Sequence, residues 1–169
     1  MPTRQIGGFS HKFGDHINTD YIISGRYKFS TLDMNELAKH IMEDLDNHFY
    51  EKIKPGDMIV AGENFGCGSS REQATLAIKH AQISAVLAKS FARIFYRNAI
   101  NGGLVVIECD TDKIEDGDQL AIDLEKGMIN NLTKNIEVKS QPLPLAMIKI
   151  LSEGGLVAYF KKYKTFEVK

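Results

Sequence analysis

The stretch MIVAGENFGCGSSRE, residues 58–72, decides the fold class. Its first four residues, 58–61, form a continuous apolar run, which is typical of a strand covered on both faces. A glycine-rich loop follows, and Ser70 is placed to cap a helix with an alanine-rich apolar face. A second short apolar run at residues 85–88 completes a strand-helix-strand unit. The sequence therefore predicts an α/β fold around a parallel sheet.

Weaker signals extend this unit in both directions. Helices are predicted where apolar residues recur at helical spacing, with a capping residue before them or a glycine pair after them. After residue 114 the pattern changes to short runs separated by turns, which indicates antiparallel strands. We expect a mixed sheet core with a β-rich accessory section. The predicted elements are helices at 33–45, 91–99 and 144–151, a strand at 104–107, and antiparallel runs at 119–124, 128–133 and 136–138.

The composition predicts one ordinary globular domain over residues 1–169. Of the 169 residues, 43% are hydrophobic and 25% are charged. Lys and Arg number 21 against 22 Asp and Glu, so the charge gives no case for a nucleic-acid or membrane-surface partner. The first eight residues lack an apolar signal core, and no apolar run reaches about 18 residues, so the sequence predicts a cytosolic protein.

The cysteine content argues against a metal site within the chain. The two cysteines, Cys67 and Cys109, have neither CxxC spacing nor a nearby Cys/His set. They cannot build a disulfide framework or a four-ligand zinc or iron–sulfur site. Any metal must therefore come from elsewhere, and no residue is predicted as a metal ligand.

The loop at residues 64–72 carries the strongest chemical signal. Its glycines let backbone N–H groups approach a ligand, and the helix N-terminus that follows favours a carboxylate or phosphate. The loop has neither a P-loop lysine nor a GxGxxG fingerprint, which disfavours nucleotides. A plain strand-to-helix turn with a serine cap would explain the glycines equally well.

Arg71 and Ser69 favour a chemical role over that plain turn. A guanidinium at the start of a helix opposes the helix dipole, so Arg71 is favourably placed only when an anion binds. It can grip a carboxylate with two parallel hydrogen bonds. Donors and positive charge around Ser69 would stabilise its alkoxide, which could take a proton from a carbon beside a carboxylate.

Three other segments carry polar side chains at close spacing. Residues 14–20 and 25–29 mix acidic, hydroxyl and basic groups, which a polar turn and solvated charges would also explain. Residues 90–98 combine three aromatic side chains with Arg93 and Arg97, a mixture that could stack nucleic-acid bases. The adjacent apolar strand and the near-zero net charge favour a structural role for this segment.

Together these segments resemble the small subunits of 3-isopropylmalate dehydratase and its relatives. The family pattern is GDxxxTDxI, then NFGxGSSRE, then SFARIFYRNAINxG, and here the three motifs begin at Gly14, Asn64 and Ser90. The match spans about residues 7–160. Three motifs in the family's order make the resemblance specific.

The resemblance implies a fold and a division of labour between two subunits. The fold would be a swivelling β/β/α domain similar to the fourth domain of aconitase. It would dock, in a heterodimer or heterotetramer, on a large subunit that holds a [4Fe–4S] cluster. The pair would isomerise 2-isopropylmalate and 3-isopropylmalate by dehydration and rehydration, in leucine biosynthesis.

The resemblance also implies roles for individual residues. Ser69 would act as the base on the substrate carbon, Arg71 would hold a carboxylate, and Asp20 would lie near the active site. The implied substrate-binding residues are Thr19, Arg26, Tyr27, Lys28, Phe29 and Ser70.

Two departures from the family pattern leave the substrate open. Gln73 stands where many isopropylmalate members have histidine, and the YKFS loop at 27–30 matches neither the isopropylmalate nor the homoaconitase versions. An apolar ring at Phe29 favours a substrate with an alkyl branch, whereas Lys28 would favour an extra carboxylate if the register shifts by one residue. Homoaconitate hydratase and dimethylmalate dehydratase are therefore the alternative activities.

Two hypotheses come from other functional classes. The chain could be a carboxylate-binding module without catalysis, although the presence of both Ser69 and Arg71 favours an enzyme. It could also bind RNA through Arg93, Tyr96 and Arg97, which the neutral composition disfavours.

Overall fold

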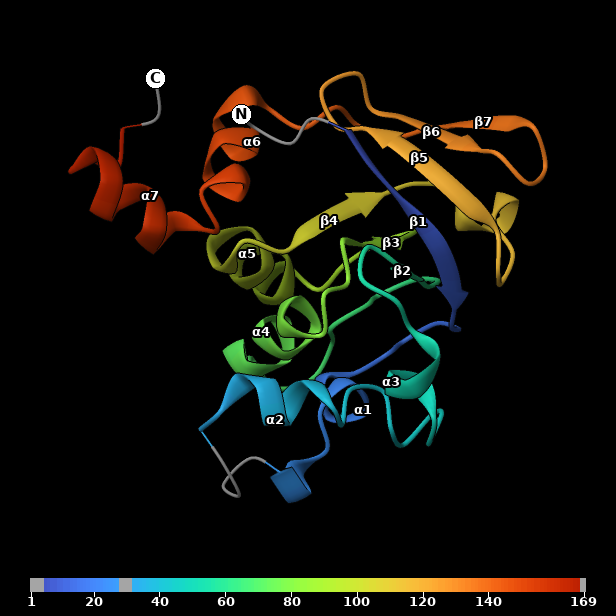
Figure 1. Cartoon of the computed structure of the whole chain (residues 1–169), viewed down its shortest axis with the longest axis horizontal. Coiled ribbons are helices and arrows are strands. Elements are labelled where there is room, and N and C mark those ends of the chain that lie inside the picture. The colour runs from blue at the N-terminus through green and yellow to red at the C-terminus, as the bar shows by residue number, and fades with distance from the viewer. Residues whose placement is uncertain (1–4, 28–31, 168–169) are drawn as a thin grey trace.

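The computed structural model describes residues 5–27 and 32–167, and its centre is a mixed sheet of seven strands (Figure 1). The strand order is β4-β3-β2-β1-β5-β6-β7. β1 pairs in parallel with β2 and antiparallel with β5, so it joins a parallel half to an antiparallel half. The strands are β1 (Gln5–Lys12), β2 (Met58–Val60), β3 (Ala85–Ala88), β4 (Val105–Glu108), β5 (Gln119–Asp123), β6 (Met128–Asn131) and β7 (Ile136–Lys139).

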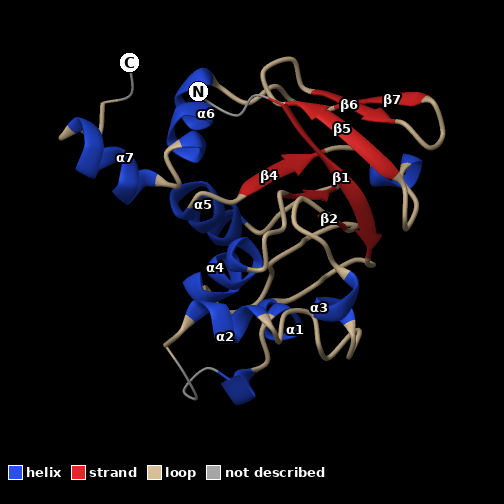
Figure 2. Cartoon of the chain, viewed as in Figure 1, coloured by secondary structure: helices blue, strands red, loops and turns tan. Residues whose placement is uncertain are grey.

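The parallel strands send alternate side chains into two separate cores. Ile59, Val86 and Val106 pack among the helices. Met58 and Leu87, on the opposite face, pack with apolar residues of the antiparallel half. Burial of each side chain of this size contributes about 1.5–3 kcal/mol. The predicted β/β/α layering is therefore confirmed, with most of the helices on one face of the parallel strands and the antiparallel strands, joined by the helix at Leu145–Ser152, on the other (Figure 2).

The helices that matter for the site cover the first of these cores. α4 and α5 pack against each other, and α2 contacts α4 on its outer side (Figure 1). The helices are α1 (Thr19–Ile22), α2 (Met34–Ala38), α3 (Phe49–Lys52), α4 (Glu72–His80), α5 (Arg93–Gly102), α6 (Leu145–Ser152) and α7 (Leu156–Tyr163).

The predicted helix at 33–45 is wrong in length. Asp33 caps it as expected, but α2 ends at Ala38. Met42 has a φ of 57°, in the left-handed region, and its N–H donates to the carbonyl of Ile22 (2.9 Å). A tertiary hydrogen bond thus replaces the helical one, and an apolar stripe at four-residue spacing does not reveal that exchange.

The remaining predicted elements are close to the observed ones. The antiparallel runs after residue 114 form β5, β6 and β7, and the last predicted helix is α6. The helix predicted at 91–99 begins at Arg93 instead and runs to Gly102, with Gly103 at a φ of 86° as its C-cap. The sequence predicted neither β1 nor α7.

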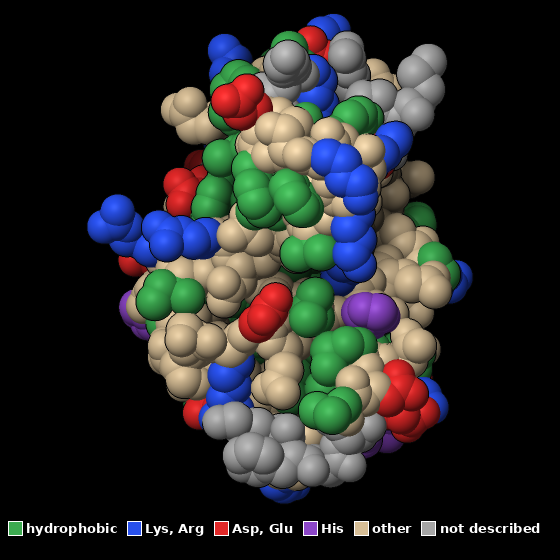
Figure 3. Space-filling model, turned by 90° about the vertical axis from the view of Figure 1, so that its left-hand side faces the viewer, with side chains coloured by type: hydrophobic (Ala, Val, Ile, Leu, Met, Phe, Trp, Pro, Cys, Tyr) green, Lys and Arg blue, Asp and Glu red, His purple; other side chains and the backbone are tan. Residues whose placement is uncertain are grey.

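α7 forms the left-hand edge of the molecule in Figure 1 and contacts α5 and α6. Tyr159 is its buried residue, whereas Val157 is 65% exposed. Figure 3 shows this side of the molecule, where hydrophobic and basic side chains lie next to one another. None of the helices in residues 5–27 and 32–167 is long and apolar enough to cross a membrane.

Candidate active site

The glycine-rich loop after β2 is bonded to the segment at residues 14–20. The N–H of Gly66 donates to the carbonyl of Ile17 (2.7 Å), and the N–H of Thr19 donates to the carbonyl of Cys67 (2.9 Å). These bonds place α1, which begins at Thr19, directly beside the loop. Two segments that are about 50 residues apart in the sequence therefore share one local structure.

The other side of the loop is bonded to the start of the third motif. The N–H of Ala92 donates to the carbonyl of Phe65 (2.9 Å), and the N–H of Asn64 donates to the hydroxyl of Ser90 (2.8 Å). α5 starts at Arg93, the residue that follows Ala92. All three motifs thus meet at the carboxyl ends of β2 and β3, where open α/β sheets commonly bind ligands.

Gly66 allows this close approach because a side chain would not fit there. Its φ is 81°, and a Cβ atom added to it would lie 2.1 Å from the ring of Phe95. We expect Gly66→Ala to lower the free energy of unfolding by about 2–5 kcal/mol, combining left-handed strain with overpacking. Gly117→Ala is the matched control, because its φ is 83° and nothing lies within 4 Å of the added Cβ.

Denaturant unfolding of both variants separates the two contributions. Gly117→Ala should cost only the backbone strain, about 1–2 kcal/mol. An equal decrease in the free energy of unfolding of the two variants would show that the Phe95 ring moves aside without cost.

Ser69 is presented to solvent by a buried threonine. The hydroxyl of Thr19 donates to the carbonyl of Ser69 (2.9 Å) and lies 3.3 Å from the Ser69 hydroxyl. Thr19 is only 2% exposed, whereas Ser69 is exposed. Thr19 therefore fixes the backbone that carries the Ser69 hydroxyl and leaves that hydroxyl accessible.

Arg71 is partly buried, and two of its buried nitrogen atoms lack hydrogen bonds. Its side chain is 19% exposed, and Nη1 lies 2.8 Å from a carboxylate oxygen of Asp20. That contact is close but poorly aligned, because neither Nε nor Nη1 makes a hydrogen bond to any described residue. Buried donors without acceptors are costly, so this guanidinium is suited to a ligand that supplies acceptors.

The start of α4 adds to the positive character of this corner. Arg71, not the predicted Ser70, is the N-cap residue of α4, and its side chain makes no capping bond. α5 also begins without a side-chain cap, at Ala92. The two helix N-termini border one pocket of ≈ 350 Å³, and both favour an anion there. The pocket is lined by Thr19, Gly66, Gly68, Ser69, Ser70, Arg71, Ala92, Arg93, Ile94, Phe95 and Asn98.

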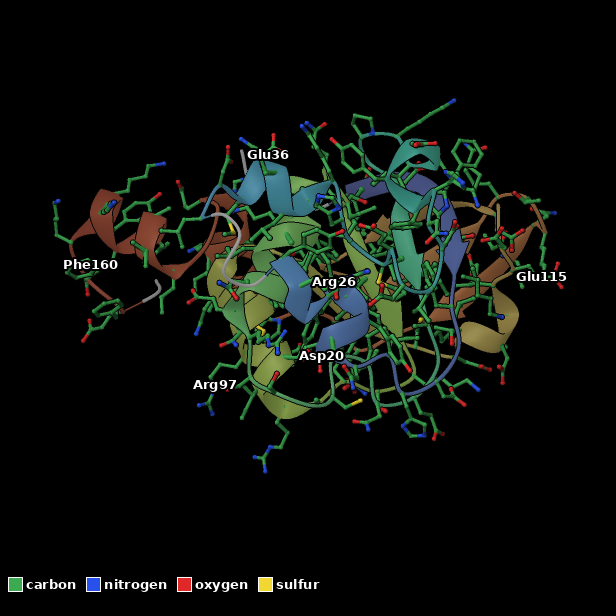
Figure 4. All side chains as sticks on the ribbon, turned by 90° about the horizontal axis from the view of Figure 1, so that it is seen from below. Asp20, Arg26, Glu36, Arg97, Glu115 and Phe160 are labelled. Atoms are coloured by element: carbon green, nitrogen blue, oxygen red, sulfur yellow. The ribbon has the colours of Figure 1, made fainter. Side chains whose placement is uncertain are left out.

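The predicted substrate loop is described only at its beginning. Arg26 donates to Asp44 (2.7 Å), and the ring of Tyr27 stacks on His40 with 3.9 Å between the ring centroids. Neither residue lines the pocket, although Asp20 and Arg26 lie on neighbouring parts of the ribbon (Figure 4). Lys28 and Phe29 lie outside the described residues.

Sequence reasoning missed two residues of the pocket. Asn98 was not singled out, and Arg93 was considered only for base stacking or a structural role. The signal that could have found them is the position of their motif immediately after β3, since the ends of neighbouring parallel strands lie together.

Potential metal ligands do not cluster among the residues that the structure describes. Within the described ranges, no group of three His, Cys, Asp or Glu side chains lies close enough to hold a metal ion. Burial raises the pKa of the Cys109 thiol to about 12, and this thiol belongs to no such group of described residues.

The sequence of this chain matches a known protein family. Residues 17–112, more than half of the chain, match the family described as the aconitase C-terminal domain. The chain belongs to that family. The matched residues include the loop at 64–72, α1 and α5.

Individual relatives cover nearly the whole chain. The 3-isopropylmalate dehydratase small subunit 2 of Archaeoglobus fulgidus is 58% identical over 95% of this chain and 98% of its own length. The methanogen homoaconitase small subunit of Methanocaldococcus jannaschii is 55% identical over 97% of this chain and 96% of its own. A crystal structure of 3-isopropylmalate dehydratase from the same organism superposes with a TM-score of 0.90, at 56% identity over 95% of each chain.

Proposed function

We propose that this member of the family is the small subunit of a hydro-lyase that interconverts 2-isopropylmalate and 3-isopropylmalate in leucine biosynthesis. The observation that carries the proposal is the partly buried Arg71 guanidinium, whose buried Nε and Nη1 atoms make no hydrogen bond to a described residue, beside the exposed Ser69 hydroxyl. The names of the A. fulgidus relative and of several others support the choice of substrate. We further propose that the chain acts in the cytoplasm and moves as one swivelling domain.

In this proposal Arg71 binds one carboxylate of the substrate. Its Nε and Nη atoms form a planar fork that matches the two carboxylate oxygens. Asp20 contacts Nη1 from the side and holds the fork in place, as a positioning residue. The two uncapped helix N-termini supply further positive potential around a second carboxylate.

Ser69 then acts on the carbon next to the bound carboxylate. Its oxygen takes the proton from that carbon during dehydration and returns a proton during rehydration. Arg71 and the N-terminus of α4 lower the cost of negative charge on this oxygen. Thr19 keeps the Ser69 backbone in place while the proton moves, and Ser70 completes the wall of the pocket on the substrate side.

The large subunit completes the site. We assign to it a [4Fe–4S] cluster, which when bound supplies a Lewis acid for the departing hydroxyl. Both relatives are named as small subunits, and such a name implies a large subunit for each of them.

The substrate is tested by assembling the chain with its cluster-bearing subunit under anaerobic conditions. The ultraviolet absorbance of the unsaturated intermediate is then followed with 2-isopropylmalate, homoaconitate and dimethylmalate. The proposal predicts the highest kcat/KM for 2-isopropylmalate. The M. jannaschii relative makes homoaconitate the second candidate, and turnover of homoaconitate alone would select it.

Phe29→Arg tests which loop residue discriminates between these substrates. A cation in place of the apolar ring should raise the ratio of kcat/KM for homoaconitate over 2-isopropylmalate by at least about tenfold, because it can pair with the extra carboxylate. Phe29→Leu is the control and should leave the ratio unchanged. An unchanged ratio in the arginine variant as well would assign discrimination to another residue.

A further inference from the structure

A second pocket lies beside the active-site pocket, between α5, β4 and residues 141–147. Its volume is ≈ 510 Å³. Apolar side chains form its floor, among them Phe91, Ile107 and Leu143, each less than 10% exposed. Met147 of α6 closes one end and is half-buried. We call this pocket the α5–β4 groove.

The edge of the groove carries positive charge that the chain does not neutralise. Arg93 and Arg97 are four residues apart on α5, so they lie on the same face of the helix. Both are exposed, and neither has an ion pair or hydrogen bond with a described residue. Figure 4 shows Arg97 extending from α5 away from the body of the protein. Glu108 is the acidic residue that lines the groove, which leaves one positive charge in excess.

The groove adjoins the active-site pocket at Arg93. Arg93 lines both, and Ile94, which lines the active-site pocket, is 57% exposed. Ser69 is exposed at the mouth of the same region. A subunit that brings a cluster to Ser69 therefore lies close to Arg93, which lines the same pocket as Ser69.

We propose that the α5–β4 groove receives an acidic segment of the large subunit. An apolar side chain of that segment fills the floor, and its carboxylates pair with Arg93 and Arg97. This inference rests on the proposed function, because the partner is the cluster-bearing subunit. Charge complementarity selects an acidic segment, since desolvated arginines without carboxylates would oppose docking.

Arg97→Glu tests the groove, because Arg97 lies outside the active-site pocket. We expect the dissociation constant of the two subunits, measured by anaerobic calorimetry, to rise at least about tenfold. This loss of affinity should become smaller as salt is added, because the paired charges are partly exposed to solvent. Turnover at saturating large subunit should match the wild type. Lys126→Glu, at the exposed turn before β6, makes the same change of charge and should leave the affinity unaltered.

Several outcomes would separate this inference from the proposed function. An unchanged affinity in folded Arg97→Glu, as judged by circular dichroism, would overturn the groove assignment. Self-association of the isolated chain that Arg97→Glu abolishes would assign the groove to a second copy and also overturn it. If Arg97→Glu weakens assembly but the wild-type complex turns over none of the three malates, the groove stands and the proposed function fails.

Discussion

Ser69→Ala is expected to lower kcat of the assembled enzyme by about 10²- to 10⁴-fold, the range that a positioned general base contributes. The variant removes the only atom of this side chain that can take a proton. The Thr19 hydroxyl still donates to the backbone carbonyl of residue 69, so the loop should keep its structure. Steady-state turnover at saturating large subunit measures the loss.

The controls separate chemistry from assembly. The dissociation constant of the two subunits should not change in Ser69→Ala. Ser152→Ala removes another serine hydroxyl, on α6, and should leave turnover unaltered. Full turnover by Ser69→Ala in an intact complex would favour the carboxylate-binding module without catalysis.

Arg71→Ala should lower kcat/KM by about 10²- to 10⁴-fold, because two hydrogen bonds to a charged group are worth about 1.5–3 kcal/mol each. Arg71→Lys keeps the charge but loses the planar fork, so it should recover only part of this loss. The same exchange at Arg97, which lies outside the active-site pocket, should leave kcat/KM unchanged at saturating large subunit.

The stability of the isolated chain provides a second measurement on Arg71. The alanine variant loses an ion pair whose Asp20 side chain is 57% exposed, a pair of the kind that contributes little. It also removes buried donors that have no hydrogen-bond acceptor among the described residues. We therefore expect the free energy of unfolding to fall by less than about 1 kcal/mol. A much larger loss would make Arg71 a structural residue.

The parallel half of the fold could be predicted because its strands are buried on both faces. Strands of this kind form short uninterrupted apolar runs, as at residues 58–61 and 85–88, and a helix between two such runs predicts parallel pairing. The antiparallel half was predicted from short runs separated by turns. Both predictions depend on local patterns that tertiary contacts leave intact.

β1 and the end of α2 could not be predicted for a different reason. β1 contains two adjacent glycines, and Ser10 is its one buried residue, so it has no apolar alternation. Gly8 is required because an added Cβ would lie 2.0 Å from the carbonyl oxygen of Gly56. α2 ends at Ala38, and the predicted helix does not continue through Met42, whose N–H bonds to the carbonyl of Ile22, a contact with no local signal. In each case a distant segment determines the local structure.

The candidate site, like the fold, could be predicted only in the features that depend on local sequence. The loop around Ser69 and Arg71 was identified from glycines and a charge opposed to the helix dipole, which are local features. The burial of Arg71 against Asp20 and the support of Ser69 by Thr19 arise only when the motifs meet in space. The excess charge at Arg97 also became apparent only once its neighbours were known.

The central claim is that this chain completes a catalytic site that neither subunit has alone. The most direct test mixes the chain with its cluster-bearing large subunit, purified anaerobically, and follows the absorbance of the unsaturated intermediate from 2-isopropylmalate. We predict no turnover by either subunit alone, turnover on mixing, and loss of that turnover when Ser69→Ala replaces the wild type. Turnover by the large subunit alone at the rate of the mixture would contradict the claim.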